Sequence, residues 1–251
     1  MSRRTTAIAA ALSVLALGSP LITGCTNPSA TQYFNQGVEK YEAGNYQGAI
    51  EDYTKAIDVD PQNADAYYNL GLAKYKLGDY KGSIVEYTKA IEINPQYADA
   101  YGNRGVALDD LEDYQGAIAD YTKAIEINPQ HANSYYNRGI AKSDLEDYQG
   151  AILDYTRAIE FNPQNADAYY NRGNSKRKLN DYQGAIADYT KAIEIDPQHA
   201  NAYGNRGFSK GVGFQDSDGA CSDFKKAASL GSEYRINWLN SDEGAWCRNM
   251  Q

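Results

Sequence analysis

The chain is poor in the residues from which metal and redox sites are built. It has three cysteines and two histidines among 251 residues. Both histidines, His131 and His199, occupy equivalent turn positions after Pro-Gln, and no Cys-His or His-Glu spacing suits a set of metal ligands. The 22 glycines are spread along the chain and are not gathered in a phosphate-binding loop. The sequence therefore predicts no metal site, no nucleotide-binding loop and no cofactor.

Basic residues are also few. The chain has 24 lysines and arginines against 33 aspartates and glutamates, which gives a net charge of −9. Nucleic-acid binding needs clustered Lys and Arg, and this composition does not provide them. The carboxylates recur on repeated helix faces and at helix caps, which is the pattern of a solvated surface. We therefore expect neither an enzyme nor a protein that binds nucleic acid or a small-molecule substrate.

One apolar run lies near the start of the chain, at residues 7–17. It is about half as long as the ~20 residues that a membrane-spanning helix needs. It follows Arg3 and Arg4, and it precedes Leu-Ile-Thr-Gly-Cys, which ends at Cys25 and resembles a bacterial lipobox. This arrangement predicts a lipoprotein signal peptide over residues 1–24.

On this interpretation Cys25 carries the lipid, and residues 25–29 form the lipidated N-terminus with a short linker. The protein would be exported and anchored at the periplasmic face of a bacterial membrane, inner or outer. A plain secretory signal with an incidental cysteine is the alternative. Signal removal takes away two positive charges and no negative one, so the net charge would move from −9 to −11. Such a chain would be drawn to anionic lipid only through its acyl chains.

Five consecutive blocks of 34 residues fill most of the remaining sequence, with bounds 30–63, 64–97, 98–131, 132–165 and 166–199. Glycine recurs at the eighth position, and alanine or serine recurs at the twentieth and twenty-seventh. Tyrosine recurs at the fourth and twenty-fourth positions, and a proline at the thirty-second closes each block. A period of this length indicates stacked supersecondary units, each of which needs its neighbours to bury its apolar face.

Each block has room for two helices of about three to four turns before its closing proline. Small residues let the two helices approach closely, and the tyrosines fill the flanks. An Asn or Asp precedes the second helix of every block, where its side chain can cap the free amide groups: Asn45, Asp79, Asp113, Asp147 and Asp181. The repeated unit is therefore predicted to be a helix–turn–helix hairpin.

This pattern resembles the tetratricopeptide repeat, with tyrosine at the first aromatic position, where that family usually has tryptophan. The resemblance covers residues 30–199 fully. It extends through a divergent sixth block, 200–231, which has one extra residue and lacks the closing proline. The resemblance implies an all-α solenoid, a right-handed superhelix of antiparallel helix pairs, with a C-terminal cap over residues 232–251. The tail is similar, more loosely, to those of cyanobacterial tetratricopeptide lipoproteins.

The two remaining cysteines, Cys221 and Cys247, lie close to the C-terminus. An exported protein meets an oxidising compartment, so we expect a disulfide that pins the cap to the sixth block, with two buried free thiols as the alternative. The last repeat needs a cover because its apolar face has no following neighbour. Residues 232–240 predict a short helix with three side chains available for burial: Ile236, Trp238 and Leu239.

Four blocks carry an arginine just before the eighth-position glycine and an aspartate just before the second-helix aromatic residue. The pairs are Arg104 and Asp120, Arg138 and Asp154, Arg172 and Asp188, and Arg206 and Asp223. An arginine that faces its aspartate would neutralise both charges at a partly buried seam. Asp52 and Glu86 occupy the same acidic position in blocks without the arginine. This favours a structural role over a ligand contact.

An asparagine recurs at the sixth position of all six blocks: Asn35, Asn69, Asn103, Asn137, Asn171 and Asn205. In tetratricopeptide proteins this position faces the concave groove, and the resemblance implies a ladder that holds an extended peptide by its backbone. A carboxamide suits this role because it offers one acceptor and two donors. The alternative is that each asparagine hydrogen-bonds its own scaffold, and the sequence leaves both open.

Other groove positions vary along the chain. At the fifth position, flat apolar side chains alternate with gaps: Phe34, Tyr68, Tyr136 and Tyr170, against Gly102 and Gly204. The second position holds Asp65, Asp99 and Asp167, where a basic residue would be wanted to grip a carboxylate, so acidic chaperone tails are poor candidate ligands. Mixed charges imply a ligand that is basic towards one end: Glu42, Asp110 and Asp144 with Lys76, Arg177 and Lys178.

The sequence as a whole predicts a membrane-anchored interaction scaffold or assembly adaptor that binds a protein or an extended peptide. One alternative is a pilotin-like or envelope-assembly factor. Another is a structural protein that assembles with itself, although the predicted cap and disulfide argue against end-to-end stacking.

The lipid anchor is tested by Cys25→Ser. We expect this variant to move from the membrane to the soluble fraction, because two or more acyl chains give stable anchoring that the rest of an acidic chain cannot replace. Fractionation after high-salt and carbonate washes measures the change. A variant that stays with the membrane after both washes would place the anchor elsewhere.

Overall fold

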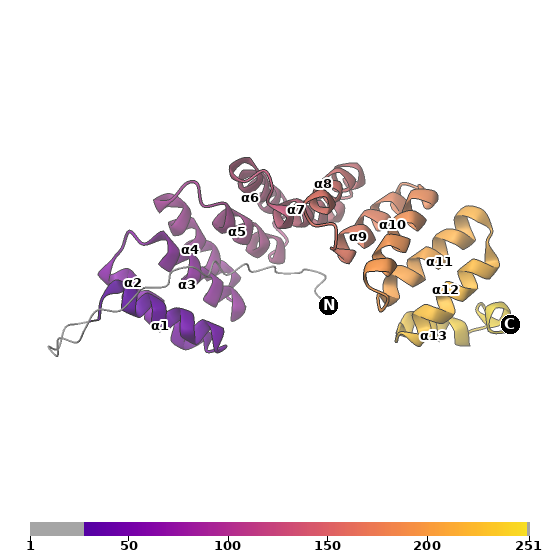
Figure 1. Ribbon diagram of the computed structural model, residues 1–251, viewed down its shortest axis with the longest axis horizontal. Helices are drawn as coiled ribbons and strands as arrows, with labels where there is room; N and C mark the ends of the chain where they lie inside the picture. The colour runs from indigo at the N-terminus through magenta and orange to yellow at the C-terminus, as the bar shows by residue number, and fades with distance from the viewer. Residues whose placement is uncertain (1–27, 250–251) are drawn as a thin grey trace. The chain divides into compact units, whose positions relative to one another are not determined.

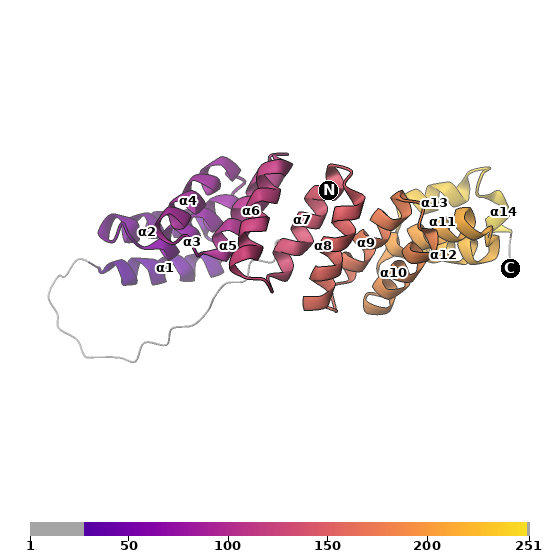
Figure 2. The same cartoon turned by 90° about the horizontal axis from the view of Figure 1, so that it is seen from above.

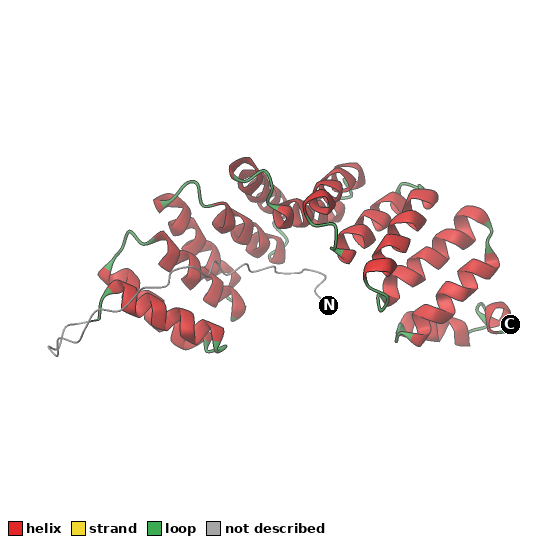
Figure 3. Ribbon diagram, in the orientation of Figure 1, coloured by secondary structure: helices red, strands yellow, loops and turns green. Residues whose placement is uncertain are grey.

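The computed structural model of the protein describes residues 28–249. Cys25 and the predicted signal segment lie outside the described residues. Every regular element within 28–249 is a helix (Figure 3). Contacts divide the chain into two compact units, with the boundary between Pro129 and Gln130.

The first unit contains three antiparallel helix pairs, one for each of the first three blocks (Figure 1). Its helices are α1 (Ala30–Glu42), α2 (Tyr46–Val59), α3 (Ala64–Lys76), α4 (Tyr80–Ile93), α5 (Ala98–Asp110) and α6 (Tyr114–Ile127).

The second unit contains three further pairs and two short terminal helices. Its helices are α7 (Ala132–Asp144), α8 (Tyr148–Phe161), α9 (Ala166–Lys178), α10 (Tyr182–Ile195), α11 (Ala200–Phe214), α12 (Ser217–Ser229), α13 (Glu233–Asn240) and α14 (Ala245–Arg248). In both units the first helix of each pair begins at the first residue of its block. The all-α hairpin architecture predicted from the period is therefore confirmed.

The second helices of the first five pairs begin at the predicted caps. In the second block the Asp79 carboxylate accepts a hydrogen bond from the Gly82 amide at 2.9 Å. A Cβ on Gly82 would lie 2.0 Å from that carboxylate, so the glycine lets Asp79 approach the amide in this position. The same Asn or Asp to Gly arrangement recurs at α2, α6, α8 and α10.

Four of the first helices, α3, α7, α9 and α11, also have side-chain caps, at the last position of the preceding block, whereas Tyr97 before α5 makes no such bond. His131 and His199, which the sequence placed simply in turns, accept hydrogen bonds through Nδ1 from the amides of Ser134 and Ala202. Asn63 and Asn165 cap α3 and α9 in the same way. A polar acceptor at this position satisfies one of the free amide groups with which every helix begins.

The two helices of a pair touch where glycine meets tyrosine. In the second block the Tyr87 ring lies against Gly71, where a Cβ would come within 2.6 Å of the ring. The second-helix tyrosines at this position are at most 1% exposed: Tyr53, Tyr87, Tyr121, Tyr155 and Tyr189. Small residues on the adjacent turns, such as Ala90, are fully buried beside them. The helices approach closely because one side of the contact has no side chain.

Successive pairs stack in order within each unit. The first helices contact one another, α1 with α3 and α3 with α5 in one unit, and α7 with α9 and α9 with α11 in the other. They do so more closely than successive second helices do. The first helices therefore form one continuous surface in each unit, which we call the first-helix face.

The C-terminal helices cover the last pair (Figure 2). A disulfide joins Cys221 on α12 to Cys247 on α14, as expected from the two cysteines. Trp238 on α13 meets the Phe224 ring edge-on at a centroid distance of 4.9 Å. Ring contacts and a covalent link thus hold the cap on the apolar side of α12.

The side chains that the cap buries differ from the prediction. Ile236 is 38% exposed, whereas Arg235 is buried and lies 4.0 Å over the centre of the Phe224 ring. The Arg235 guanidinium also donates to the Gly204 carbonyl at 2.9 Å, so the expected gap at Gly204 is filled. Burial lowers the pKa of Arg235 from its ordinary value. An arginine can serve here because its flat cation stacks on an aromatic face.

None of the helices between residues 28 and 249 combines the length and the apolar character that crossing a bilayer requires.

The second-helix tyrosines differ in what their hydroxyls contact. The Tyr189 hydroxyl donates to Asn174 Oδ1 at 2.9 Å. Leu72 occupies the equivalent position in the second block, and the Tyr87 hydroxyl has no hydrogen-bond partner among the described residues. Burial raises the pKa of Tyr87 well above its ordinary value. A buried hydroxyl without a partner costs free energy, so the two tyrosines contribute unequally to stability.

This difference predicts opposite outcomes for two matched substitutions. Tyr87→Phe keeps the ring on Gly71 and removes an unpaired hydroxyl, so the free energy of unfolding should stay the same or rise. Tyr189→Phe removes a paired hydroxyl and should lower it by about 1 kcal/mol. Urea unfolding followed by circular dichroism compares the two variants. Equal losses in both would contradict the hydrogen-bond assignment.

Candidate functional site

The sixth-position asparagines lie along the first-helix face of each unit, and three of them bond to the preceding repeat. The side-chain amides of Asn103, Asn171 and Asn205 each donate to a tyrosine hydroxyl 35 residues earlier, at 2.8, 3.0 and 3.2 Å. The acceptors are Tyr68, Tyr136 and Tyr170. These bonds tie neighbouring first helices together within a unit.

The other asparagines lack this bond for reasons visible in the sequence. The residue 35 positions before Asn69 is Phe34, which has no hydroxyl. The Asn69 amide instead donates to the Asp65 carbonyl of its own helix at 2.8 Å. Asn35 belongs to the first block and so has no preceding repeat. The residue 35 positions before Asn137 is Gly102, which has no side chain to accept a hydrogen bond. Asn35 is exposed.

Both alternatives for the asparagines therefore have a physical basis. The scaffold uses amide hydrogens of Asn103, Asn171 and Asn205, whose Oδ1 atoms receive no hydrogen bond from the described residues. Oδ1 is the atom that accepts from a backbone N–H group. Sequence reasoning missed the tyrosine partners, although the constant spacing of 35 residues between Tyr and Asn was available as a signal.

The fifth-position tyrosines are not the flat exposed surfaces that the sequence suggested. Tyr68, Tyr136 and Tyr170 are buried, because the next first helix and the turn before it cover them. The Tyr68 ring lies 4.9 Å from that of Tyr97, and the Tyr170 ring lies 4.6 Å from that of His199. Burial raises the pKa of Tyr68. The hydroxyls of these tyrosines, and not the flat sides of their rings, lie at the first-helix face.

The arginine–aspartate seams form as predicted, and they are structural. In the fifth block Arg172 holds Asp188 with two parallel bonds of 2.9 and 2.7 Å. Its third nitrogen donates to Thr156 of the preceding block at 3.1 Å, and Lys176 reaches the same carboxylate at 2.8 Å. The pairs of Arg104, Arg138 and Arg206 have the same two-bond geometry. Because both partners are already engaged, the seams offer little to a ligand.

Blocks without the arginine use lysines at the same seam. The Asp52 carboxylate pairs with Lys40 and Lys55, and Glu86 pairs with Lys74. The hydrogen bond to Asp120 raises the pKa of Arg104, and those from Lys40 and Lys55 lower the pKa of Asp52 against the opposing effect of burial. Each seam carboxylate thus lies within a cluster of paired charges.

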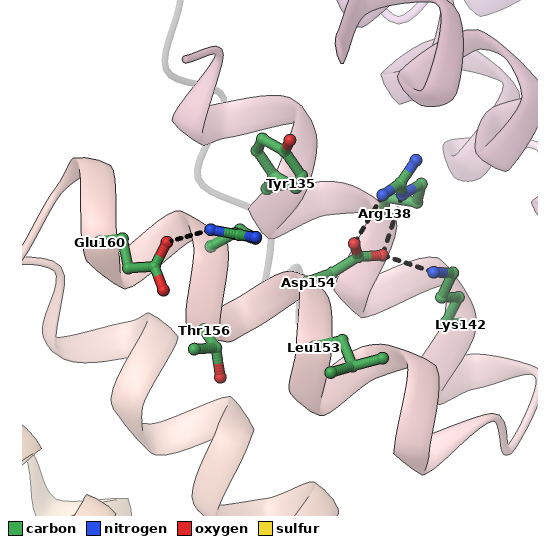
Figure 4. A pocket seen from close by; sticks show the side chains of 8 residues that line it. Tyr135, Arg138, Lys142, Leu153, Asp154, Thr156 and Glu160 are labelled. Carbon is green, nitrogen blue, oxygen red and sulfur yellow. Dashed lines mark hydrogen bonds and ion pairs between the residues drawn. The ribbon is translucent and has the colours of Figure 1, made fainter. Parts of the chain in front are cut away.

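A hollow of about 510 Å³ opens between α7 and α8 (Figure 4). Its charged side chains pair with one another, Asp154 with Arg138 and Lys142, and Arg157 with Glu160. No group of three His, Cys, Asp or Glu side chains in the described part of the chain is arranged to hold a metal ion. We therefore assign this hollow no chemistry and take the first-helix face as the candidate site.

Family models for the tetratricopeptide repeat match the chain continuously from residue 37 to residue 199. The model described as TPR repeat matches residues 37–78, 71–111 and 141–176. Two models described as tetratricopeptide repeat match residues 98–131 and 166–199, and residues 120–152. No curated protein sequence matches the chain.

Solved structures of repeat proteins are similar to most of the chain. A crystal structure of MamA is 27% identical with a TM-score of 0.62, and the match covers 66% of this chain and 96% of MamA. YrrB, described as a TPR protein with an unusual peptide-binding site, is 23% identical with a TM-score of 0.66, covering 76% of this chain and 100% of YrrB. PilF of Pseudomonas aeruginosa is 20% identical with a TM-score of 0.73, covering 84% of this chain and 96% of PilF.

The repeat signatures, the stacked hairpins and these likenesses agree with one another. Proteins built from such repeats typically serve as non-enzymatic scaffolds for protein–protein interaction, and this chain has the same architecture. The chain belongs to the tetratricopeptide repeat family.

Proposed function

We propose that this protein is a membrane-anchored scaffold that holds an extended segment of a protein partner along its first-helix faces. The observation that carries the proposal is the set of asparagine Oδ1 atoms at one position per repeat. Tyrosine hydroxyls fix the orientation of three of these asparagines, so their acceptors are preorganised. Regularly spaced acceptors suit a peptide backbone, which presents N–H groups at regular intervals.

The likenesses support a protein or peptide partner without identifying it. YrrB is described as having a peptide-binding site, but at 23% identity that likeness concerns the fold. The acidic composition also supports a protein partner, since nucleic acid would be repelled. Membrane anchoring rests on the sequence of residues 1–25, which precedes the described residues.

A role as a pilotin-like or envelope-assembly factor remains a special case of this proposal, distinguished only by the partner. Self-assembly into a longer array is less favoured. The cap helix α13 and the Cys221–Cys247 disulfide cover the end of the last repeat, where another copy would have to stack.

Site-specific photocrosslinking in native membranes tests the proposal. A benzophenone amino acid at Asn171, on the first-helix face, should capture a partner protein on illumination. The matched control is the same probe at Leu153, which is 69% exposed on the second helix α8. Mass spectrometry of the captured bands identifies the partner. Equal capture from both positions, or none above background, would contradict binding at this face.

A second test separates the site role of the asparagines from their scaffold role. Asn103→Ala removes the Oδ1 acceptor and the bond to Tyr68, whereas Tyr68→Phe removes only that bond. Both variants should lose similar stability, about 1 kcal/mol, in thermal unfolding. Asn103→Ala should also weaken binding of the crosslinked partner about fivefold, whereas Tyr68→Phe, which keeps the acceptor but no longer fixes its orientation, should weaken it by less. Equal affinities in the two variants would make the asparagine purely structural.

A further inference from the structure

Arg177 on α9 is a cation without an anionic partner in a strongly acidic chain. Its neighbour Lys176 pairs with Asp188, and Lys178 lies 5.9 Å over the Tyr148 ring. No carboxylate among the described residues pairs with Arg177, and its buried Nε has no hydrogen-bond partner there. By contrast, Arg157 pairs with Glu160. Burial of part of an unpaired guanidinium costs free energy that a bound anion would recover.

The repeat pattern explains why the partner is missing. In the first unit Tyr75, at the twelfth position of its block, donates from its hydroxyl to Asp110, which lies 35 residues later on the next first helix. Arg177 is the twelfth residue of the fifth block, and the residue 35 positions after it is Val212. The thirteenth position of a block thus holds a carboxylate in the third block and an apolar side chain in the sixth. Val212 is 53% exposed.

The surroundings of Arg177 hold the guanidinium in place. Its central carbon lies 5.4 Å from the centre of the Phe208 ring on α11. Asn174, one turn earlier on α9, is held by the Tyr189 hydroxyl at 2.9 Å and the Asn205 amide at 2.8 Å. The charge and hydrogen bond of Arg177 oppose the raising of the Tyr189 pKa by burial. Stacking leaves the edge of a guanidinium free to bind a carboxylate in bidentate fashion.

Two apolar side chains extend the same surface. Phe208 is 38% exposed and lies one helical turn before Val212, so the two share a face of α11. One cation beside two exposed apolar groups combines two kinds of recognition in one place. Arg177 also belongs to a basic last turn of α9, together with Lys176 and Lys178.

We propose that Arg177, Phe208 and Val212 form a subsite for a short motif in the partner, an Asp or Glu side chain adjacent to an apolar side chain. The inference rests on the proposed function and specifies what part of the partner binds in the second unit. Charge complementarity is the argument for this occupant, because the basic last turn of α9, with Arg177 unpaired by any carboxylate of the described residues, attracts an acidic side chain. The partner's carboxylate would fix the register of the bound segment, because the asparagines bind its backbone and do not distinguish its side chains.

Peptide selection with the full chain in detergent tests the subsite. Random linear peptides displayed on phage should yield sequences with an acidic residue next to an apolar one when selected on the natural protein. Selection on Arg177→Gln should lose that acidic preference. An enriched peptide, synthesised with an amidated C-terminus, should bind Arg177→Gln about tenfold more weakly in fluorescence anisotropy.

Three controls make the result specific. Arg157→Gln removes the same charge from the exposed pair on α8 and should leave affinity within about twofold. Arg177→Lys keeps the charge without the planar fork and should restore only part of the affinity. An acid-to-amide version of the peptide should bind the natural protein and Arg177→Gln equally. Thermal unfolding of both Arg177 variants measures the loss of the Phe208 contact and of the hydrogen bond to Tyr189, and affinities are compared at a temperature where both variants are fully folded.

The outcomes distinguish failure of the subsite from failure of the proposed function. The same acidic preference on Arg177→Gln, or enriched peptides without acidic residues, would overturn the subsite and leave peptide binding intact. Peptides that depend on Arg177 only when their C-terminus is free would overturn the assignment to a side-chain carboxylate. If no peptide is enriched on the natural protein, both inferences fail.

Discussion

The contact between a second-helix tyrosine and a first-helix glycine sets the geometry of each hairpin. A Cβ on Gly105 would lie 2.7 Å from the Tyr121 ring, and the other four blocks show the same close approach. Arg104 precedes this glycine and Asp120 precedes this tyrosine in the sequence. Packing the ring on the glycine therefore brings the two charges together, and they form bonds of 2.7 Å. Apolar packing positions the seam, and in the third, fifth and sixth blocks the arginine of the seam also donates to a threonine of the preceding hairpin.

Buried polar groups in the described part of this protein are largely satisfied within their own repeat or by the neighbouring one. Aspartates next to the buried tyrosines meet arginine or lysine, and tyrosine hydroxyls meet asparagines. Such pairing is expected, because a buried charge or hydroxyl is costly unless it is bonded. This pairing also leaves few polar side chains that a partner protein could bind. On the first-helix faces of the described residues, asparagine Oδ1 atoms and the Arg177 guanidinium are polar groups that a partner could still engage.

Irregularities between otherwise similar repeats thus carry the specific information. A perfectly regular array would present the same contacts at each step and would bind a partner in any register. Val212 stands where the third block has Asp110, so Arg177 has no carboxylate partner among the described residues. Asn174 stands where the other blocks have an apolar residue, such as Leu72, and gives the Tyr189 hydroxyl a partner that the Tyr87 hydroxyl lacks. The difference at Val212 lies on the first-helix face, and the difference at the tyrosine hydroxyls lies beneath it. The first is therefore available for recognition, whereas the second affects stability alone.

The sequence by itself determined the repeat period, the helix pairs, the caps of the second helices and the arginine–aspartate seams, because these depend on residues within one block. It also led to the Cys221–Cys247 disulfide, since only two cysteines remained for the cap. The tertiary structure decided which polar groups stay free. Tyr68 is buried and bonds Asn103, and Arg235 is buried where Ile236 was expected. These outcomes depend on contacts between residues that lie about 35 positions apart, in neighbouring repeats. The pattern of a single block does not show whether the residue in the next block carries a hydroxyl, a carboxylate or an apolar side chain.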